Sequence, residues 1–414
     1  MIDYSLLREE DPTIGEALTN ELNRQQHGLE LIPSENFVSE AVMQALGSIA
    51  TNKYSEGYPG KRYYGGMEFV DIIEQTAIDR AKELFGAEHA NVQPLSGGPM
   101  NIAVYFALLQ PGDTVLGMDL GHGGHLTHGH PVTTMAKLYN FVRYACNPDT
   151  GEIDFEELRR LAHEHKPKIV LAGFSAYSRE LDYAKFHEIA QEVGAVSMMD
   201  MAHIGGLVAG GAAKNPVPIM DIVTTTTHKS LRGPRGGLIL CKAEFAKVID
   251  KSVFPGFQGG PHENQIAALA VALKEAAAPE FKIYSTQIVK NAKALCAALQ
   301  SGGMRILFGG TDNHLILADV TPLGLTGHEA ETLLDSVGIT VNKNMIPRDP
   351  RKPMDPSGIR MGTPALTTRG MGELEMTRIG EMMVRLLKST ADLTVQEEAR
   401  VMVKELTEEF PLYS

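Results

Sequence analysis

Residues 222–241 read IVTTTTHKSLRGPRGGLILC, and this stretch decides the fold. Its β-branched start predicts a short buried strand that delivers Lys229 to the strand end. Glycine and proline between 233 and 237 then interrupt regular structure, and a second apolar strand follows at 238–241. Because burial favours the neutral, nucleophilic form of an amine, a lysine placed there suits Schiff-base chemistry. From this stretch alone, a solvated loop lysine is an equally good interpretation.

An acid ends the strand that comes before. Residues 195–200 read AVSMMD, so an apolar strand is predicted to finish at Asp200. A buried carboxylate is costly unless a cation or a hydrogen bond meets it. The protonated ring nitrogen of pyridoxal phosphate is such a cation, and an acid holds its proton in place. Asp200 and Lys229 therefore suggest a cofactor ring held at both ends.

Strands and helices alternate through the middle of the chain. Apolar strands are expected at 114–119 and 168–172, with helices near 154–161 and 186–193. This alternation predicts a mainly parallel sheet whose ligands lie at the carboxyl ends of the strands, where Ser175, Asp200 and Lys229 fall. No glycine-rich dinucleotide fingerprint or Walker sequence follows a strand, which argues against NAD and ATP.

Two irregular stretches precede that region. Residues 51–66 read TNKYSEGYPGKRYYGG, a loop rich in tyrosine and glycine; such loops commonly carry function, although a plain surface loop is the alternative. A helix is then expected over 68–87, with Ile72, Ile73, Ala77 and Ala81 on its inner face. Residues 96–98 (SGG) open the next helix, and backbone N–H groups there predict a phosphate cradle.

A histidine-rich stretch follows at 120–130, LGHGGHLTHGH. Four closely spaced histidines raise the question of a zinc site. The glycines between them provide no rigid scaffold, and no cysteine or carboxylate lies nearby in the sequence. We therefore expect no metal here, and we interpret the stretch as an aromatic shelf over a flat ring.

These motifs together are close to a known family. DMAHIGGLV at 200–208, followed by TTTTHKSLRGPRGG at 224–237, resembles serine hydroxymethyltransferase of bacterial or archaeal length. The tyrosine-bearing loop, GGHLTHG at 123–129, QGGP at 258–261 and SGIRMGTPALTTRG at 357–370 match the same family in the same order. The resemblance implies an α/β fold of the fold-type I class: a large domain with a mainly parallel seven-stranded sheet and a smaller α+β C-terminal domain.

The resemblance also implies residue roles. For catalysis it implies Lys229 as the Schiff-base lysine for pyridoxal 5'-phosphate, Glu56 as the acid–base group for the substrate hydroxyl, His125 stacked on the ring, Asp200 on the ring nitrogen, and Tyr54 and Tyr64 lining the site. For cofactor binding it adds Ser96, Gly97, Gly98, Ser175, His203, Thr226, His228, Gly259 and Gly260. For the amino acid and the folate it implies Ser34, Tyr64, Arg360, Leu120, Gly124, Leu126 and Asn344.

The implied activity is reversible transfer of the serine hydroxymethyl group to tetrahydrofolate, giving glycine and 5,10-methylenetetrahydrofolate. A folate-independent aldolase for β-hydroxy or α-methyl amino acids is the alternative, because Leu95, Pro99, Met100 and Met345 depart from the family pattern. A non-catalytic protein that binds pyridoxal or nucleic acid is a third possibility. The resemblance further implies a homodimer with shared active sites, or a tetramer.

Composition fits this interpretation. The 414 residues carry a net charge of −13, which argues against nucleic acid and anionic membranes as partners. Three scattered cysteines indicate free thiols in a reducing compartment, and the N-terminal residues show no signal-peptide pattern, so we expect a soluble cytoplasmic protein. We predict a helical arm over 1–30, a large domain over 31–280 and a small domain over 281–414.

Overall fold

The computed structural model describes residues 2–413 and divides into two compact units. Asn36–Thr286 form one unit, here called the central unit. The residues before Asn36 and those from Gln287 onward form the other, the terminal unit. The first 35 residues therefore pack with the C-terminal part of the chain, because Leu29 and Glu30 pair in parallel with Ile339 and Thr340.

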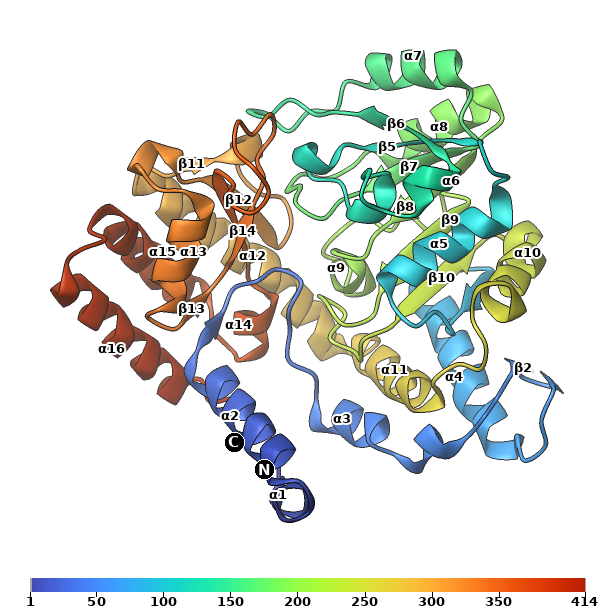
Figure 1. The fold of residues 1–414 in the computed structure, drawn as a ribbon, viewed down its shortest axis with the longest axis horizontal. Coiled ribbons are helices and arrows are strands. Elements are labelled where there is room, and N and C mark those ends of the chain that lie inside the picture. Colours follow the sequence, from blue (N-terminus) through green and yellow to red (C-terminus); the bar gives the residue numbers. More distant parts are fainter. Residues whose placement is uncertain (1, 414) are drawn as a thin grey trace. The chain divides into compact units, whose positions relative to one another are not determined.

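The central unit is built on a seven-stranded sheet with the order β4-β10-β9-β8-β7-β5-β6. The strands from β9 to β6 are parallel, whereas β10 is antiparallel to both β9 and β4. Figure 1 shows α7 and α8 beside β5–β8, and α5 and α10 beside β9 and β10. The sheet is mainly parallel, as the sequence predicted. Its strands are β4 (His89–Asn91), β5 (Thr114–Met118), β6 (Asn140–Tyr144), β7 (Ile169–Gly173), β8 (Val196–Asp200), β9 (Ile222–Thr226) and β10 (Gly237–Cys241), and a separate hairpin is formed by β2 (Gly57–Tyr58) and β3 (Lys61–Arg62). Its helices are α3 (Glu40–Leu46), α4 (Glu68–Phe85), α5 (Gly97–Leu108), α6 (Met135–Leu138), α7 (Phe155–His165), α8 (Tyr183–Val193), α9 (Gly205–Ala209), α10 (Ala246–Lys251) and α11 (Glu263–Ala276), and α12 (Pro279–Ser301) continues into the terminal unit.

Local chemistry explains these elements. Every residue of β7, β9 and β10 is buried, which accounts for their continuous apolar or β-branched sequences. The side chain of Asp154 accepts hydrogen bonds from Glu156 N and Glu157 N and so begins α7. Helix α4 ends at Gly86, which is left-handed with φ of 72°.

Two features of the central unit differ from the sequence-based expectation. The short strand β4 and the partly exposed strand β6 were not predicted. The inner face of α4 is also rotated: Ile72 is 61% exposed, whereas Glu74 is fully buried. The hydrophobic pattern placed a charged residue outside, but the structure gives Glu74 a buried cationic partner, Arg62.

The terminal unit combines a four-stranded antiparallel sheet, ordered β11-β12-β15-β14, with helices. One continuous apolar core lies between this sheet and the helices and includes Ile316, Met361, Ile379 and Met383. The unit has strands β1 (Leu29–Glu30), β11 (Arg305–Ile306), β12 (Leu315–Asp319), β13 (Ile339–Thr340), β14 (Asn342–Asn344) and β15 (Gly358–Gly362), and helices α1 (Ser5–Glu10), α2 (Pro12–His27), α13 (Gly327–Asp335), α14 (Pro364–Thr368), α15 (Glu373–Lys388) and α16 (Leu393–Glu409). Helix α16 was not predicted; it follows α15 and buries Met402 and Leu406.

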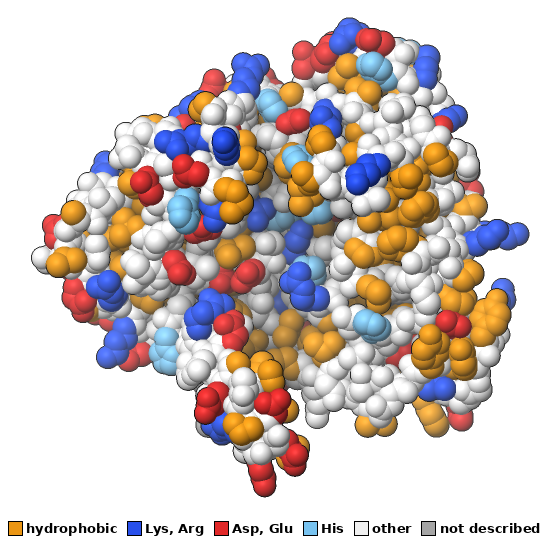
Figure 2. Space-filling view, viewed as in Figure 1, with side chains coloured by type: hydrophobic (Ala, Val, Ile, Leu, Met, Phe, Trp, Pro, Cys, Tyr) orange, Lys and Arg blue, Asp and Glu red, His pale blue; other side chains and the backbone are white. Residues whose placement is uncertain are grey.

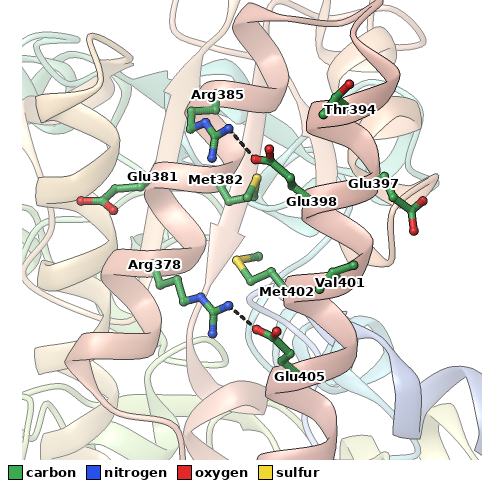
Figure 3. Close-up of a pocket in the computed structure, with 10 residues that line it drawn as sticks. All are labelled: Arg378, Glu381, Met382, Arg385, Thr394, Glu397, Glu398, Val401, Met402 and Glu405. Carbon is green, nitrogen blue, oxygen red and sulfur yellow. Dashed lines mark hydrogen bonds and ion pairs between the residues drawn. The ribbon is translucent and has the colours of Figure 1, made fainter.

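A groove of about 470 Å³ runs between α15 and α16. Figure 3 shows Met382 and Met402 between the helices, and two ion pairs that cross from one helix to the other. These pairs join Arg378 to Glu405 and Arg385 to Glu398. None of the predicted site residues lines this groove. Among the described residues, no helix is both long and apolar enough to cross a membrane.

Candidate active site

Asp200 lies at the carboxyl end of β8, where three donors hold its carboxylate. Asn101 Nδ2 donates to Asp200 Oδ2 at 2.8 Å, and His128 Nε2 lies 3.1 Å from the same oxygen. The backbone N–H of Ala202 donates to Oδ1 at 3.0 Å. Burial alone would raise the pKa of Asp200, but the hydrogen bonds and charge of its neighbours outweigh burial and hold the pKa well below its ordinary value. The carboxylate therefore stays ionised.

The donors themselves are fixed by further contacts. His128 Nδ1 accepts from His125 N at 3.2 Å, so its Nε2 carries the proton that points at Asp200. Asn101 Oδ1 accepts from Thr224 Oγ1 at 2.9 Å, which directs the amide nitrogen to Asp200. Sequence reasoning missed Asn101 and the contact of His128. The sequence signal was an asparagine near the start of the apolar helix α5.

Two histidines of the histidine-rich stretch lie close to the carboxylate of Asp200. The ligand atoms of His125, His128 and Asp200 lie within 4.8 Å of one another, a grouping that can hold a metal ion. The expectation that no carboxylate lies near these histidines was therefore wrong: Asp200 is far from them in the sequence but close to them in the structure. A metal at this point would displace the N–H···O bond from His128 to Asp200. The hydrogen bonds to Asp200 instead favour an ionised carboxylate that binds a cation other than a metal ion.

Lys229 follows β9, the strand beside β8, where Asp200 pairs with Thr224. Lys229 is 9% exposed. Its backbone carbonyl accepts from Asn36 Nδ2 and Arg232 N, both at 3.0 Å. The same Asn36 amide donates to Tyr284 OH at 2.8 Å, so the turn after β9 is held in place from outside the sheet.

The surroundings fit a phosphate-bearing ring. His228 Nδ1 is buried and has no hydrogen-bond partner among the described residues. Burial, followed by the charges of Arg235 and Lys229, lowers the pKa of His228 to about 3, so the ring is neutral. At the start of α5, a Cβ on Gly97 would lie 2.7 Å from Thr226 Cγ2, which keeps this position free of a side chain. A bound anion at the α5 N-terminus would face backbone N–H groups there.

The other predicted cofactor contacts lie at neighbouring strand ends. Ser175 follows β7, and its N–H donates to Gly123 O at 2.7 Å. His203 is 2% exposed, and its carbonyl accepts from Ser230 Oγ at 2.8 Å. Thr226 Oγ1 donates to Ala202 O at 3.2 Å, which joins the ends of β8 and β9.

A second cluster gathers the tyrosine-bearing loop and the QGGP segment. The rings of Tyr54 and Tyr64 are 5.1 Å apart between centroids. Gly259 and Gly260 lie against Glu56: a Cβ on Gly259 would be 3.4 Å from Glu56 Oε1, and one on Gly260 3.7 Å from Glu56 Cγ. Figure 1 shows the β2–β3 hairpin on a different side of the central unit from α9, which directly follows the Asp200 segment. The structure therefore forms two groups of predicted site residues in this unit.

The remaining predicted contacts divide between the units. Ser34, Asn344 and Arg360 belong to the terminal unit, where Arg360 Nε donates to Asn342 Oδ1 at 3.0 Å. Burial lowers the pKa of Arg360 to about 10, so the guanidinium is still charged at neutral pH. In the central unit, Leu120 and Leu126 begin two short 3-10 turns, and Leu126 is 45% exposed. Gly124 has no room for a side chain, since its Cβ would lie 2.2 Å from Met118 O.

A mainly parallel α/β sheet with an acid and a lysine at adjacent strand ends defines a fold-type I pyridoxal-phosphate enzyme. The match to known families is more specific. Residues 7–383 match the model of the family described as serine hydroxymethyltransferase, and the chain belongs to that family. It is thus a pyridoxal-phosphate-dependent transferase of serine and glycine one-carbon metabolism.

Proposed function

We propose that this enzyme reversibly transfers the hydroxymethyl group of serine to tetrahydrofolate, giving glycine and 5,10-methylenetetrahydrofolate. The observation that carries the proposal is that Asp200 ends β8 and Lys229 follows the adjacent strand β9, beside a buried His228 Nδ1 that has no hydrogen-bond partner among the described residues. Pyridoxal phosphate, when bound, supplies an electron sink for bonds broken at the substrate α-carbon. The residues of the chain position that sink and move the protons.

In this proposal, Lys229 is the amine that attaches the cofactor, and Asp200 keeps the ring nitrogen protonated because its own pKa is held low. His125 lies over the ring face. Ser96, Gly97 and Gly98 at the α5 N-terminus bind the phosphate, and Gly259 and Gly260 reach the phosphate of the neighbouring subunit. Ser175, His203, Thr226 and His228 are further contacts of the cofactor. Ionised Asp200 is the partner that a protonated ring nitrogen requires.

Arg360 is proposed to bind the substrate carboxylate. A desolvated guanidinium gains most from a bidentate carboxylate, and the lowered pKa of Arg360 reports that desolvation. Ser34 and Tyr64 complete the amino-acid site. Leu120, Gly124, Leu126 and Asn344 are proposed contacts of the folate.

Glu56 is proposed to move the proton of the substrate hydroxyl, and to do so in the site of a second copy of the chain. The tyrosines beside it are unusually exposed for aromatic residues: Tyr54 is 58% and Tyr63 is 75% exposed. Figure 2 shows hydrophobic side chains spread over the face that carries α5, α10 and the β2–β3 hairpin. An apolar face of this kind is typical of a surface that pairs with another subunit.

The test is an absorbance and turnover experiment on purified, cofactor-supplemented protein. A visible absorbance band displaced to longer wavelength from that of the free cofactor is expected in the absence of amino acid for the wild type and not for Lys229→Ala, because Lys229 is the amine proposed to attach the cofactor aldehyde. Retention of that band in Lys229→Ala contradicts the assignment. A wild type without any visible band points instead to a non-catalytic protein.

Serine cleavage with and without tetrahydrofolate separates the transferase from the aldolase. Turnover that depends on tetrahydrofolate is expected. Equal turnover of serine without it favours the folate-independent aldolase. The structure gives Met100, one of the residues that depart from the family pattern, a place in the apolar core at 0% exposure, so this departure has a packing role.

A further inference from the structure

A buried arginine holds the backbone on both sides of Glu56. The side chain of Arg62 is 3% exposed, and its Nη1 donates to Ser55 O at 2.8 Å and to Gly57 O at 3.0 Å. These two carbonyls flank Glu56 directly. The partner strand adds a third constraint, because Tyr63 N donates to Glu56 O at 3.0 Å.

Three carboxylates surround the same guanidinium. Arg62 Nε donates to Asp71 Oδ1 at 2.9 Å, and Nη2 donates to Glu74 Oε2 at 2.6 Å. Glu263 Oε1 lies 3.7 Å from Nη2. The side chains of Glu74 and Glu263 are both fully buried. One buried cation thus faces three carboxyl groups. If all three were ionised, the buried cluster would carry uncompensated negative charge, which is costly in a low-dielectric interior.

The cluster also connects the other parts of the second group of site residues. Gln93 Nε2 donates to Glu74 Oε1 at 2.7 Å and to Gly57 O at 2.9 Å. Gln258, which begins the QGGP segment, donates through Nε2 to Gln93 O at 2.7 Å. The Glu56 loop and the QGGP segment are therefore attached to one buried set of charges.

We propose that Arg62 is a positioning residue for Glu56, and that Glu263 is the carboxyl of this cluster that carries a proton, which limits the excess negative charge around Arg62. The proposal rests on the acid–base role proposed for Glu56 and deepens it. Neither oxygen of Glu263 has a hydrogen-bond partner within 3.5 Å among the described residues. Burying a neutral carboxyl without a hydrogen-bond partner costs less free energy than burying a carboxylate.

The pH dependence has a definite sign. The charged groups that face Glu263 are Glu74 of α4 and Arg62 of β3, with Asp71 on the far side of the guanidinium. Burial, with the charge of Glu74 adding to it, raises the pKa of Glu263 from 4.5 to about 7. A raised folded-state pKa contributes stability that is fully present below 4.5 and is lost as the pH rises through about 7.

The first experiment is a double-mutant cycle on serine cleavage by the holoenzyme. Arg62→Lys keeps the charge but cannot hold both carbonyls and Glu74, so kcat should fall about a hundredfold with little change in KM, as a misplaced catalytic group does. In a Glu56→Gln background the same change should add almost nothing, because the group being positioned is already disabled. Arg159→Lys, at a surface arginine with three acidic partners, should match the wild type.

The second experiment does not depend on activity. Thermal stability of the wild type should decline between pH 4.5 and about 7 more steeply than that of Glu263→Gln, which copies the neutral carboxyl. Glu83→Gln, at an exposed position on the same helix as Glu74, is the control and should follow the wild type. If thermal stability depends on pH in the same way in the wild type and in Glu263→Gln, the proposal is overturned. This test holds even if Arg62→Lys fails to fold.

The outcomes distinguish the catalytic role of Glu56 from the positioning role of Arg62. If Glu56→Gln alone leaves serine cleavage unchanged, the catalytic role of Glu56 in the proposed function is wrong. If Glu56→Gln is impaired but Arg62→Lys costs the same factor in both backgrounds, the positioning role of Arg62 is wrong while the proposed function stands. Loss confined to the background with an intact Glu56 supports both.

Discussion

At the scale of single residues, the most informative group is the set of donors around Asp200. Two side chains and one backbone N–H fix a carboxylate at the end of a buried strand. Each side-chain donor is oriented in turn, Asn101 by Thr224 and His128 by the backbone of His125. Because the donors favour the charged form, the acid is prepared for a cation before a cofactor arrives.

Removing one of these donors should weaken the binding of the cofactor. Asn101→Ala should weaken pyridoxal phosphate binding about ten- to hundredfold, since a hydrogen bond to a charged group contributes about 1.5–3 kcal/mol. Titration of the apo-protein with cofactor, followed by absorbance, measures this. Asn264→Ala removes a single bond to a backbone carbonyl, Leu46 O, and is the matched control. Equal affinities in the two variants would show that Asn101 does not support Asp200.

At the scale of elements, the strands that carry the site could be predicted because each is a short run of mostly apolar or β-branched residues. Strands β7, β8 and β9 were expected within a residue or two of their observed bounds. The contacts of Asp200 with Asn101 and His128 were out of reach, since these residues are 99 and 72 positions away in the chain. Periodicity describes one element at a time, and it contains no information on such pairs.

Helix α16 shows the same limit. Its sequence is rich in charged residues, which is typical of a solvated segment, yet Met402 and Leu406 are 2% and 1% exposed in the core of the terminal unit. The face of α4 was misplaced for a related reason, because the burial of Glu74 depends on Arg62 of the β2–β3 hairpin, which lies outside the helix. Sequence patterns assign charge to the surface, and only tertiary pairing reverses that assignment.

The packing of α16 can be measured directly. Leu406→Ala should destabilise the terminal unit by about 2–4 kcal/mol, the usual cost of removing a buried leucine side chain. Val401→Ala, on the same helix but 47% exposed, should change stability by less than about 0.5 kcal/mol. Urea denaturation followed by circular dichroism compares the two. Similar midpoints for both variants would mean that α16 adds little to the core.

At the scale of the whole molecule, the predicted site residues of the central unit fall into two groups, and Figure 1 shows β2 away from α9 in that unit. One group contains Lys229 and Asp200, and the other contains Glu56, Tyr54 and the QGGP segment. Two copies of the chain that exchange these faces would each complete the site of the other. Such an exchange is the basis of the proposed homodimer.

Subunit mixing tests this arrangement. Glu56→Gln and Lys229→Ala should each be inactive alone, but their equimolar mixture should regain about a quarter of wild-type activity, because about half of randomly exchanged dimers are mixed and each of those has one intact site of two. Exchange is confirmed by mass spectrometry with one isotope-labelled partner. Absence of recovery after confirmed exchange would place Glu56 in the site of its own subunit.

The pairing of β1 with β13 has a consequence for synthesis on the ribosome. Leu29 and Leu31, both at 0% exposure in the finished protein, find their neighbours only after residue 341 has left the exit tunnel. Throughout that interval the nascent N-terminal segment carries uncovered leucines, whereas Asn36–Thr286 already holds every partner it needs for its own core. A chaperone that recognises short apolar segments would therefore be expected to bind the segment around Leu29 and Leu31 during synthesis.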